Sequence, residues 1–217
     1  VVYQDAQRWL KEGIHDALFP MMYFQGNNFY PFALDWKEND GKRWIIPGLG
    51  IYFLSPREQD WPLDEIVRQI HFTRQIKLNG QAYFRNRFLL DNTKGVLDEL
   101  EENFYTYPAL IPPMTWSDSI PPSVPSHPSV QQIANGKLRM SWQASADNSN
   151  QSVVYHLYGS DTYPVDIKQP QNLIATHLIA NEYEYTAKLP WLQKRYFAVT
   201  AADRFGNESA PLTLNTV

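Results

Sequence analysis

One stretch near the end of the chain decides the fold of its second half: Phe197-Ala198-Val199-Thr200-Ala201-Ala202-Asp203-Arg204-Phe205-Gly206-Asn207-Glu208-Ser209. Its first six residues alternate between two faces, which is typical of a β-strand with one buried side. The same period of two recurs around Leu138-Met140-Trp142, Tyr155-Leu157 and Tyr183-Tyr185. Several short strands separated by polar turns predict an all-β sandwich over residues 119–217.

Residues 1–118 follow a different pattern. Apolar runs at 17–24, 44–53 and 81–85 are typical of strands that are covered on both faces. Helical patterns are predicted at 3–12, 32–39, about 61–78 and about 93–103. Gly13 is expected to end the first of these helices. Strands that alternate with helices predict an α/β domain with a parallel sheet.

The composition changes between the two parts. Prolines are concentrated between residues 108 and 128, which predicts a stiff, extended connector. We therefore place the domain boundary between residues 118 and 119.

The overall composition narrows the possible functions. The net charge of −4 provides no basic field for nucleic acid. The absence of cysteine excludes disulfides and thiolate catalysis. The five histidines lack metal-ligand spacing, and no glycine-rich phosphate loop occurs, so we expect neither a metal nor a cofactor. No membrane span is visible in this sequence. The 7 Trp and 13 Tyr suit both core packing and carbohydrate stacking.

Residues 119–217 resemble a fibronectin type III domain. The resemblance is carried by Met140-Ser141-Trp142 and by residues 197–209, which follow the family pattern aromatic-x-Val-x-Ala-x-Asp-x-x-Gly-Asn-Glu-Ser. Phe197 stands where the family commonly has Tyr. The resemblance implies an accessory module that acts as a spacer, a docking domain or a weak glycan binder.

Residues 1–118 resemble the end of a glycosyl-hydrolase-like family that is related to glycoside hydrolase family 10. Its members are bacterial lipoproteins with a (β/α)8 (TIM) barrel. The matching residues are Asp16-Ala17-Leu18-Phe19-Pro20-Met21-Met22-Tyr23, Gly48-Leu49-Gly50-Ile51-Tyr52, Tyr83-Phe84-Arg85 with Asn92 and Gly95, and residues 107–116. Their order fits the last three βα units. The resemblance implies a fragment of a glycoside hydrolase for polysaccharide or cell-wall glycan, whose parent is periplasmic, extracellular or an outer-membrane lipoprotein.

The C-terminal ends of barrel strands carry the active site in this fold. That rule selects the candidate carbohydrate-binding residues Tyr23, Gln25, Asn28, Tyr52, Phe84 and Arg85, and Trp36, which follows Asp35 in the first loop, is a further candidate. Their amides, hydroxyls and rings suit sugar hydroxyls and sugar faces. The competing interpretation is that Tyr23 and Tyr52 only pack within the barrel, and that Arg85 forms a structural ion pair.

The acidic residues leave the catalytic residues unknown. Glycoside hydrolysis normally needs two carboxylates, and none of the three predicted strands ends in Asp or Glu. Asp60 and Asp91 are interpreted as helix-start residues, and Asp35 is the loop acid that merits a test. We therefore expect this chain to lack the catalytic pair, which leaves open whether it belongs to an enzyme.

Two alternatives remain. One is a non-catalytic glycan-binding or cell-envelope scaffold protein, and the other is an independent adhesion protein with an α/β part and a β-sandwich. Three strands of a parallel barrel would have open edges. We therefore expect the chain to self-associate, to swap strands or to stay bound to a missing part.

Overall fold

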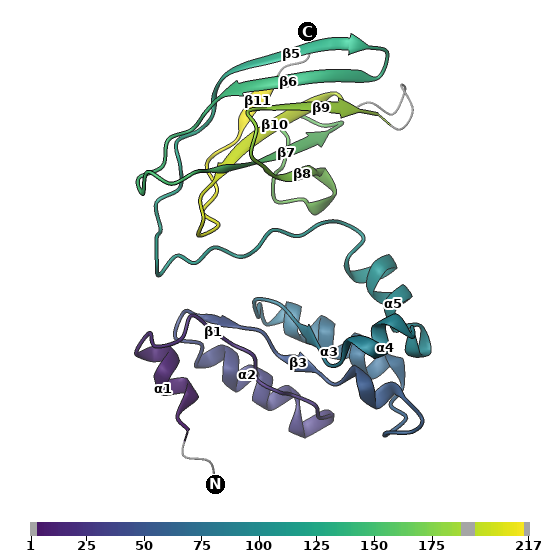
Figure 1. Ribbon diagram of the computed structural model, residues 1–217. Helices are drawn as coiled ribbons and strands as arrows, with labels where there is room; N and C mark the ends of the chain where they lie inside the picture. The colour runs from purple at the N-terminus through teal and green to yellow at the C-terminus, as the bar shows by residue number, and fades with distance from the viewer. Residues whose placement is uncertain (1–3, 188–193, 215–217) are drawn as a thin grey trace. The chain divides into compact units, whose positions relative to one another are not determined.

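The computed structural model describes residues 4–187 and 194–214 (Figure 1). The chain forms two compact units, Val1–Thr106 and Tyr107–Val217. The first unit contains helices and parallel strands, and the second contains antiparallel strands. Residues 107–118, which the sequence analysis places with the first domain, belong to the second unit.

Short parallel strands form the centre of the first unit. The strands are β1 (Ala17–Leu18), β2 (Trp44–Ile45), β3 (Gly48–Leu49) and β4 (Ala82–Tyr83). β1 pairs with β2, β3 pairs with β4, and a parallel bridge joins Met21 to Gly48. The parallel arrangement is as predicted, but the strands are shorter than the apolar runs. Pro20 and Pro47 interrupt the ladder because proline has no N–H to donate.

The helices of the first unit are α1 (Ala6–Lys11), α2 (Tyr30–Glu38), α3 (Leu63–Gln75), α4 (Asn86–Leu90) and α5 (Val96–Glu99). Between and beside them lie the 3-10 turns η1 (Gly26–Asn28), η2 (Ile51–Leu54) and η3 (Thr93–Gly95) and a π turn η4 (Leu100–Phe104). The helices predicted at 3–12 and about 61–78 form over shorter ranges, the one predicted at 32–39 forms as α2, and α4 was not predicted. Gly13 follows α1 with a φ of 74°, as a helix stop requires. Tyr3, at the start of the predicted first helix, lies outside the described residues.

The helix predicted at 93–103 is broken into η3, α5 and η4. Asn92, Lys94 and Gly95 have left-handed backbones with φ of 44°, 53° and 79°, which no α-helix accommodates. The long helix α3 buries Ile66 and Ile70 in the core of this unit.

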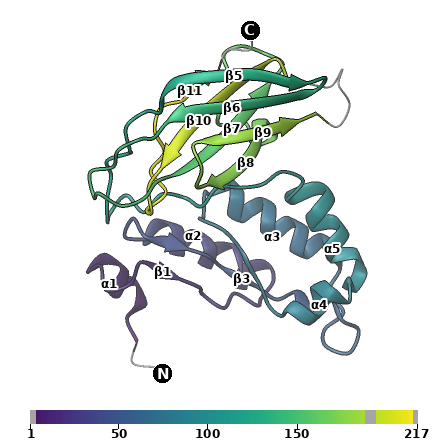
Figure 2. The ribbon, with the colours of Figure 1, turned by 45° about the horizontal axis from the view of Figure 1, so that its top comes forward.

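The second unit consists of two antiparallel sheets, seen as two layers in Figure 2. One sheet has the strand order β5 (Ser126–Ala134), β6 (Lys137–Gln143), β9 (Glu182–Thr186). The other has the order β11 (Leu212–Leu214), β10 (Tyr196–Ala202), β7 (Val154–Ser160), β8 (Leu173–Leu178). The 3-10 turn η5 (Pro170–Asn172) directly precedes β8. Met140 and Trp142 from the first sheet share one core with Leu157, Phe197 and Val199 from the second. The predicted strands β6, β7, β9 and β10 are confirmed.

The Asp-x-x-Gly-Asn turn after β10 is organised by one carboxylate. Asp203 Oδ1 accepts hydrogen bonds from the backbone N–H groups of Phe205 at 2.8 Å and Asn207 at 2.9 Å. Asp203 Oδ2 accepts a third, from Asn207 Nδ2, at 2.8 Å. Gly206 completes the turn with a φ of 79°. The polar residues of the quoted stretch therefore fix the turn, and its apolar residues fix the strand.

This turn also holds the proline-rich segment. The N–H of Met114 donates to the carbonyl of Phe205 at 2.7 Å, and Asn207 Nδ2 donates to the carbonyl of Asp118 at 2.9 Å. Leu110 packs against buried residues of the second unit, among them Tyr158 and Ala198. The segment is therefore a packed part of the second unit over residues 110–118.

Candidate functional site

Three aromatic side chains meet at the ends of the parallel strands of the first unit. Tyr23 follows β1, Tyr52 follows β3 and Phe84 follows β4. The ring of Tyr23 stacks on that of Phe84 with centroids 5.3 Å apart, and Tyr52 meets both rings edge to face, at 5.7 Å from Tyr23 and 5.6 Å from Phe84. The parallel pairing brings the three strand ends to one edge of the sheet. We call these three residues the aromatic trio.

Two glycines make this arrangement possible. A Cβ atom at Gly48 would lie 3.1 Å from Cε1 of Tyr23, and one at Gly50 would lie 3.2 Å from Cβ of Tyr23. Both distances are tighter than ordinary van der Waals contact, so the Tyr23 ring lies directly on the backbone of β3. The N–H of Tyr52 donates to the carbonyl of Phe84 at 3.1 Å, which joins the last two strand ends.

The trio is half-buried, and this affects its hydroxyl groups. Burial raises the pKa of Tyr23, and the neighbouring Tyr52 adds to the effect. Burial also raises the pKa of Tyr52, with Glu58 acting in the same direction and Arg85 in the opposite one. Both phenols are therefore neutral at pH 7, and each can donate and accept a hydrogen bond.

Arg85 is exposed and lies next to the trio in sequence. Its guanidinium carbon lies 5.5 Å from the centre of the Phe88 ring, within the range of a cation–π contact. The structural ion pair expected for Arg85 is not formed with any carboxylate of the described residues. Its hydrogen-bond donors therefore remain available to a ligand.

The other predicted residues lie away from the trio. Asn28 and Trp36 line a separate groove of about 600 Å³, together with Pro20, Met21, Met22, Phe24 and Phe32. We call it the β1 groove. Gln25 is exposed and directly precedes η1. The structure therefore brings Tyr23, Tyr52 and Phe84 together, and it does not bring Asn28 or Trp36 to them.

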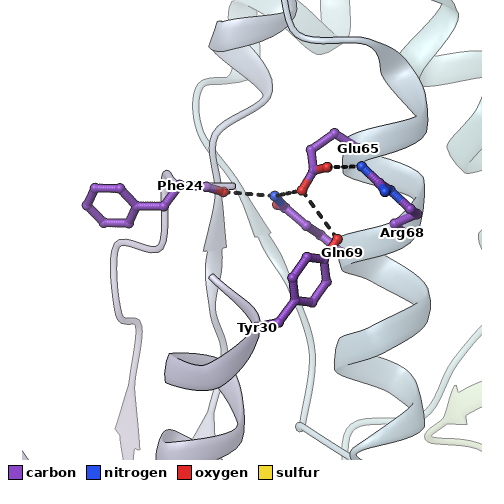
Figure 3. A network of polar contacts seen from close by, with 5 residues as sticks. All are labelled: Phe24, Tyr30, Glu65, Arg68 and Gln69. Atoms are coloured by element: carbon purple, nitrogen blue, oxygen red, sulfur yellow. Dashed lines mark hydrogen bonds and ion pairs between the residues drawn. The ribbon is translucent and has the colours of Figure 1, made fainter. Parts of the chain in front are cut away.

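A buried polar network on α3 holds the loop that follows Tyr23 (Figure 3). Gln69 Nε2 donates to the carbonyl of Phe24 at 2.9 Å and to Glu65 Oε1 at 2.9 Å. Tyr30 donates its hydroxyl to the same carboxylate oxygen at 3.3 Å, and Arg68 pairs with the other oxygen. Glu65 and Gln69 thereby tie the backbone between Tyr23 and Gln25 to a long helix.

Glu65 and Gln69 were not predicted from the sequence as part of the site. Polar residues on an amphipathic helix are ordinarily assigned to its solvated face. Glu65 and Gln69 are nevertheless almost fully buried beside Ile66 and Ile70. Their spacing of four, next to two apolar residues with the same spacing, was the available signal.

The carboxylates that the sequence analysis singled out have partners elsewhere. Asp35 lies on α2, where Gln7 Nε2 donates to it at 2.7 Å. Asp60 pairs with Lys94 at 2.6 Å, and Asp91 pairs with Arg87 at 3.2 Å.

The helix-start interpretation of the last two acids is wrong. Pro62, and not Asp60, is the residue directly before α3, and Asp91 follows the last residue of α4 instead of preceding a helix.

No three acidic or histidine side chains converge as a metal site would require within the part of the chain that the structure describes. No helix there is long and apolar enough to cross a membrane.

No family model matches the chain. It is 29% identical over 219 residues to the glycosyl hydrolase YngK of Bacillus subtilis (strain 168), which covers 96% of this chain and 42% of that protein. The chain therefore spans less than half the length of this relative.

Solved structures are more distant. A bacterial orthologue of human α-L-iduronidase has a TM-score of 0.32 and 18% identity, over 44% of this chain and 15% of that one. The FN5 domain of Drosophila Lar has a TM-score of 0.27 and 15% identity, over 44% of this chain and 96% of that one. The relationship that these comparisons show is therefore a similarity to a glycosyl hydrolase along nearly the whole of this chain.

Proposed function

We propose that this chain is the glycan-binding part of a glycoside hydrolase-like protein, and that the aromatic trio with Arg85 contacts the sugar. The observation that supports this most is the meeting of three aromatic side chains from successive parallel strand ends. In α/β folds built from parallel strands, the carboxyl ends of the strands are the ordinary place for a ligand.

The chemistry of the trio suits a carbohydrate. Phe84 is 46% exposed and offers a ring face to the apolar C–H side of a sugar. The neutral hydroxyls of Tyr23 and Tyr52 can exchange hydrogen bonds with sugar hydroxyls. Arg85 adds exposed donors, which would favour a glycan that carries carboxylate groups. Polysaccharide and cell-wall glycan are the substrate classes that we propose.

The domain identities are part of the same proposal. Residues 1–118 would be the last three βα units of a (β/α)8 barrel, and residues 119–217 a fibronectin type III accessory module. The parallel strands and the two antiparallel sheets support these assignments. The parent protein would be periplasmic, extracellular or an outer-membrane lipoprotein.

Catalysis would need groups from outside this chain. Glycoside hydrolysis normally uses two carboxylates on either side of the scissile bond. Asp35, Asp60 and Asp91 are engaged by neighbouring side chains away from the trio. We therefore assign substrate binding to this chain, and the acid–base pair to the remainder of a longer protein.

The first experiment measures binding of a panel of polysaccharides and peptidoglycan fragments by titration calorimetry. We expect saturable binding to at least one glycan, and a loss of affinity of about tenfold in Phe84→Ala. Tyr163→Ala, which removes an exposed aromatic residue from the second unit, is the matched control and should bind normally. A panel without any binder, or equal affinities in Phe84→Ala and the parent chain, would contradict the proposal.

A non-catalytic glycan-binding or scaffold protein is the second candidate. The engaged carboxylates favour it, since they leave no acid–base pair among the residues that were singled out. Glycan turnover by the longer natural protein decides between the two. Turnover that falls in Phe84→Ala supports the enzyme, whereas binding without turnover supports the scaffold.

A further inference from the structure

The chain contains two Asn-Gly dipeptides, Asn79-Gly80 and Asn135-Gly136. Asparagine is one of the thermolabile residues of proteins, and a following glycine makes it reactive. The backbone nitrogen of the glycine can attack the side-chain amide carbon of the asparagine, because glycine has no Cβ to hinder the approach. The attack releases ammonia and closes a succinimide ring. Water then opens the ring at either carbonyl and leaves aspartate, or isoaspartate, in which the backbone runs through the former side chain.

The first dipeptide is fixed to a neighbouring strand. The N–H of Asn79 donates to the carbonyl of Ile45 in β2 at 3.1 Å, and Asn79 Oδ1 accepts from the N–H of Ile45 at 3.0 Å. Asn79 is also half-buried. Since the backbone and the amide of Asn79 are both held by one residue, hydrogen bonds must break before the amide carbon can turn toward the nitrogen of Gly80.

The second dipeptide lies in an open turn. Asn135 and Gly136 form the loop of the hairpin between β5 and β6, in which Ala134 pairs with Lys137. Asn135 is exposed, and its side chain forms no hydrogen bond within residues 4–187 and 194–214. In the same ranges, the N–H of Gly136 donates to no backbone carbonyl. Neither the attacking nitrogen nor the amide that it attacks is therefore restrained.

We propose that Asn135 is a site of spontaneous covalent modification in the folded protein, and that it converts to isoaspartate and aspartate while Asn79 persists. The carbonyl of Gly136 accepts a hydrogen bond from the N–H of Ala187 at 2.9 Å. Isoaspartate adds a methylene group to the backbone directly before this glycine, so the hydrogen bond to Ala187 is lost in the converted chain. The inference concerns this hairpin, and it does not depend on glycan binding.

The test follows both asparagines during incubation of the 217-residue chain in mildly alkaline buffer. Peptide mapping with electron-transfer fragmentation separates asparagine, aspartate and isoaspartate at each position. In the folded chain we expect Asn135 to convert at least about tenfold faster than Asn79, which must first give up its hydrogen bonds. In concentrated urea, which removes these restraints, the two rates should agree to within about threefold. Equal rates in the folded chain, or a difference that persists in urea, would overturn the proposal.

Hydrogen exchange at the amide of Ala187 tests the structural consequence. We expect this amide to exchange about tenfold faster in the converted chain than in the parent chain. Asn135→Asp is the matched control, because it adds the negative charge without the methylene group, and it should leave the exchange slow. Unchanged exchange in the converted chain would overturn the loss of this hydrogen bond. Equally fast exchange in Asn135→Asp would overturn its assignment to the added methylene group.

Discussion

The two units of this chain differ in how completely they bury their apolar side chains. The second unit encloses Met140, Trp142 and Phe197 between two sheets. The first unit leaves Met21 and Phe24 in contact with solvent at the free edge of β1. The strands of the second unit are assembled into two sheets that face one core, although β6 and β9, and β7 and β10, are far apart in sequence. In the first unit, β1 pairs with β2 alone among the described residues, so one edge of β1 is left next to the exposed side chains.

The largest loss of stability is expected from a substitution that leaves a cavity in the core of the second unit. Phe197 is fully buried, and its ring contacts Tyr185 with centroids 5.1 Å apart. We expect Phe197→Ala to lower the free energy of unfolding of the second unit by about 3–5 kcal/mol, through lost burial and a cavity. Urea unfolding followed by hydrogen exchange and mass spectrometry reports each unit separately.

The neighbouring Tyr196 supplies the control for this variant. Its side chain points to the other face of β10 and is exposed. Tyr196→Ala should change the stability of the second unit by less than about 1 kcal/mol. If the two substitutions cost the same, the two-sheet core is not what stabilises this unit.

The buried network on α3 allows a test in the first unit. Gln69→Leu removes both hydrogen bonds of Gln69 Nε2, and it leaves the carbonyl of Phe24 and the carboxylate of Glu65 without that donor. We expect a loss of about 1–3 kcal/mol in the first unit and faster amide exchange in the loop after Tyr23. Gln75→Leu, at the exposed end of the same helix, is the control. Unchanged exchange in the loop of Gln69→Leu would show that the network does not hold it.

A substitution in the turn that anchors the proline-rich segment is expected to have a smaller effect on the stability of the second unit. Gly206 has a φ of 79°, and a Cβ atom there would lie 3.3 Å from both the carbonyl oxygen of Ile111 and Cα of Pro113. We expect Gly206→Ala to destabilise the second unit by about 1–2 kcal/mol. Gly206→Asn tolerates the same backbone conformation, so it separates backbone strain from crowding of the segment. An unchanged urea midpoint in both variants would contradict the packing described for residues 110–118.

The smallest expected effect depends on pH. Burial lowers the pKa of His156, Glu208 opposes this, and His177 adds to it. Since the folded state takes up the proton at lower pH than the unfolded state, the unfolded state binds more protons below pH of about 6.5. Stability of the second unit should therefore be complete above that pH and fall as the pH drops, by at most about 1.4 kcal/mol per pH unit.

His156→Gln removes this titration, so its stability should depend less on pH between 7.5 and 5.5. His127→Gln changes an exposed histidine of the same unit and should keep the parental dependence. Identical pH profiles for His156→Gln and the parent chain would show that His156 is not the group responsible.

The sequence predicts the second unit better than the first, for a physical reason. Phe197, Val199 and Ala201 lie in the core between the two sheets, as the period of two predicts. The intervening residues of β10 are buried as well, so the expectation of a single buried side is wrong for this strand. The strands β5, β8 and β11 were missed because their burial does not alternate strongly: β5 is mostly exposed along its length. In the first unit, the apolar runs predict where strands lie, but Pro20 and Pro47 end the pairing earlier than the runs suggest.

The candidate site, too, could be predicted from the sequence only in part. Tyr23, Tyr52 and Phe84 could be placed together because each ends an apolar run, and parallel strands bring such ends to one edge. The separation of Trp36 from them could not be predicted, since it depends on which face of α2 is turned toward the β1 groove. The burial of Glu65 and Gln69 was not predicted, because their polarity says nothing of the Phe24 carbonyl to which Gln69 donates.

The contact between Tyr23 and the bare backbone of Gly48 constrains how this protein can diverge. A methyl group at position 48 would press on the ring of Tyr23, so alanine there becomes acceptable only after a smaller residue has replaced the tyrosine. The two positions are thus expected to change together or not at all among descendants of this sequence. A lineage that keeps glycine at 48 also keeps the freedom to carry a large ring at 23, and that pairing can be sought in any collection of related genes.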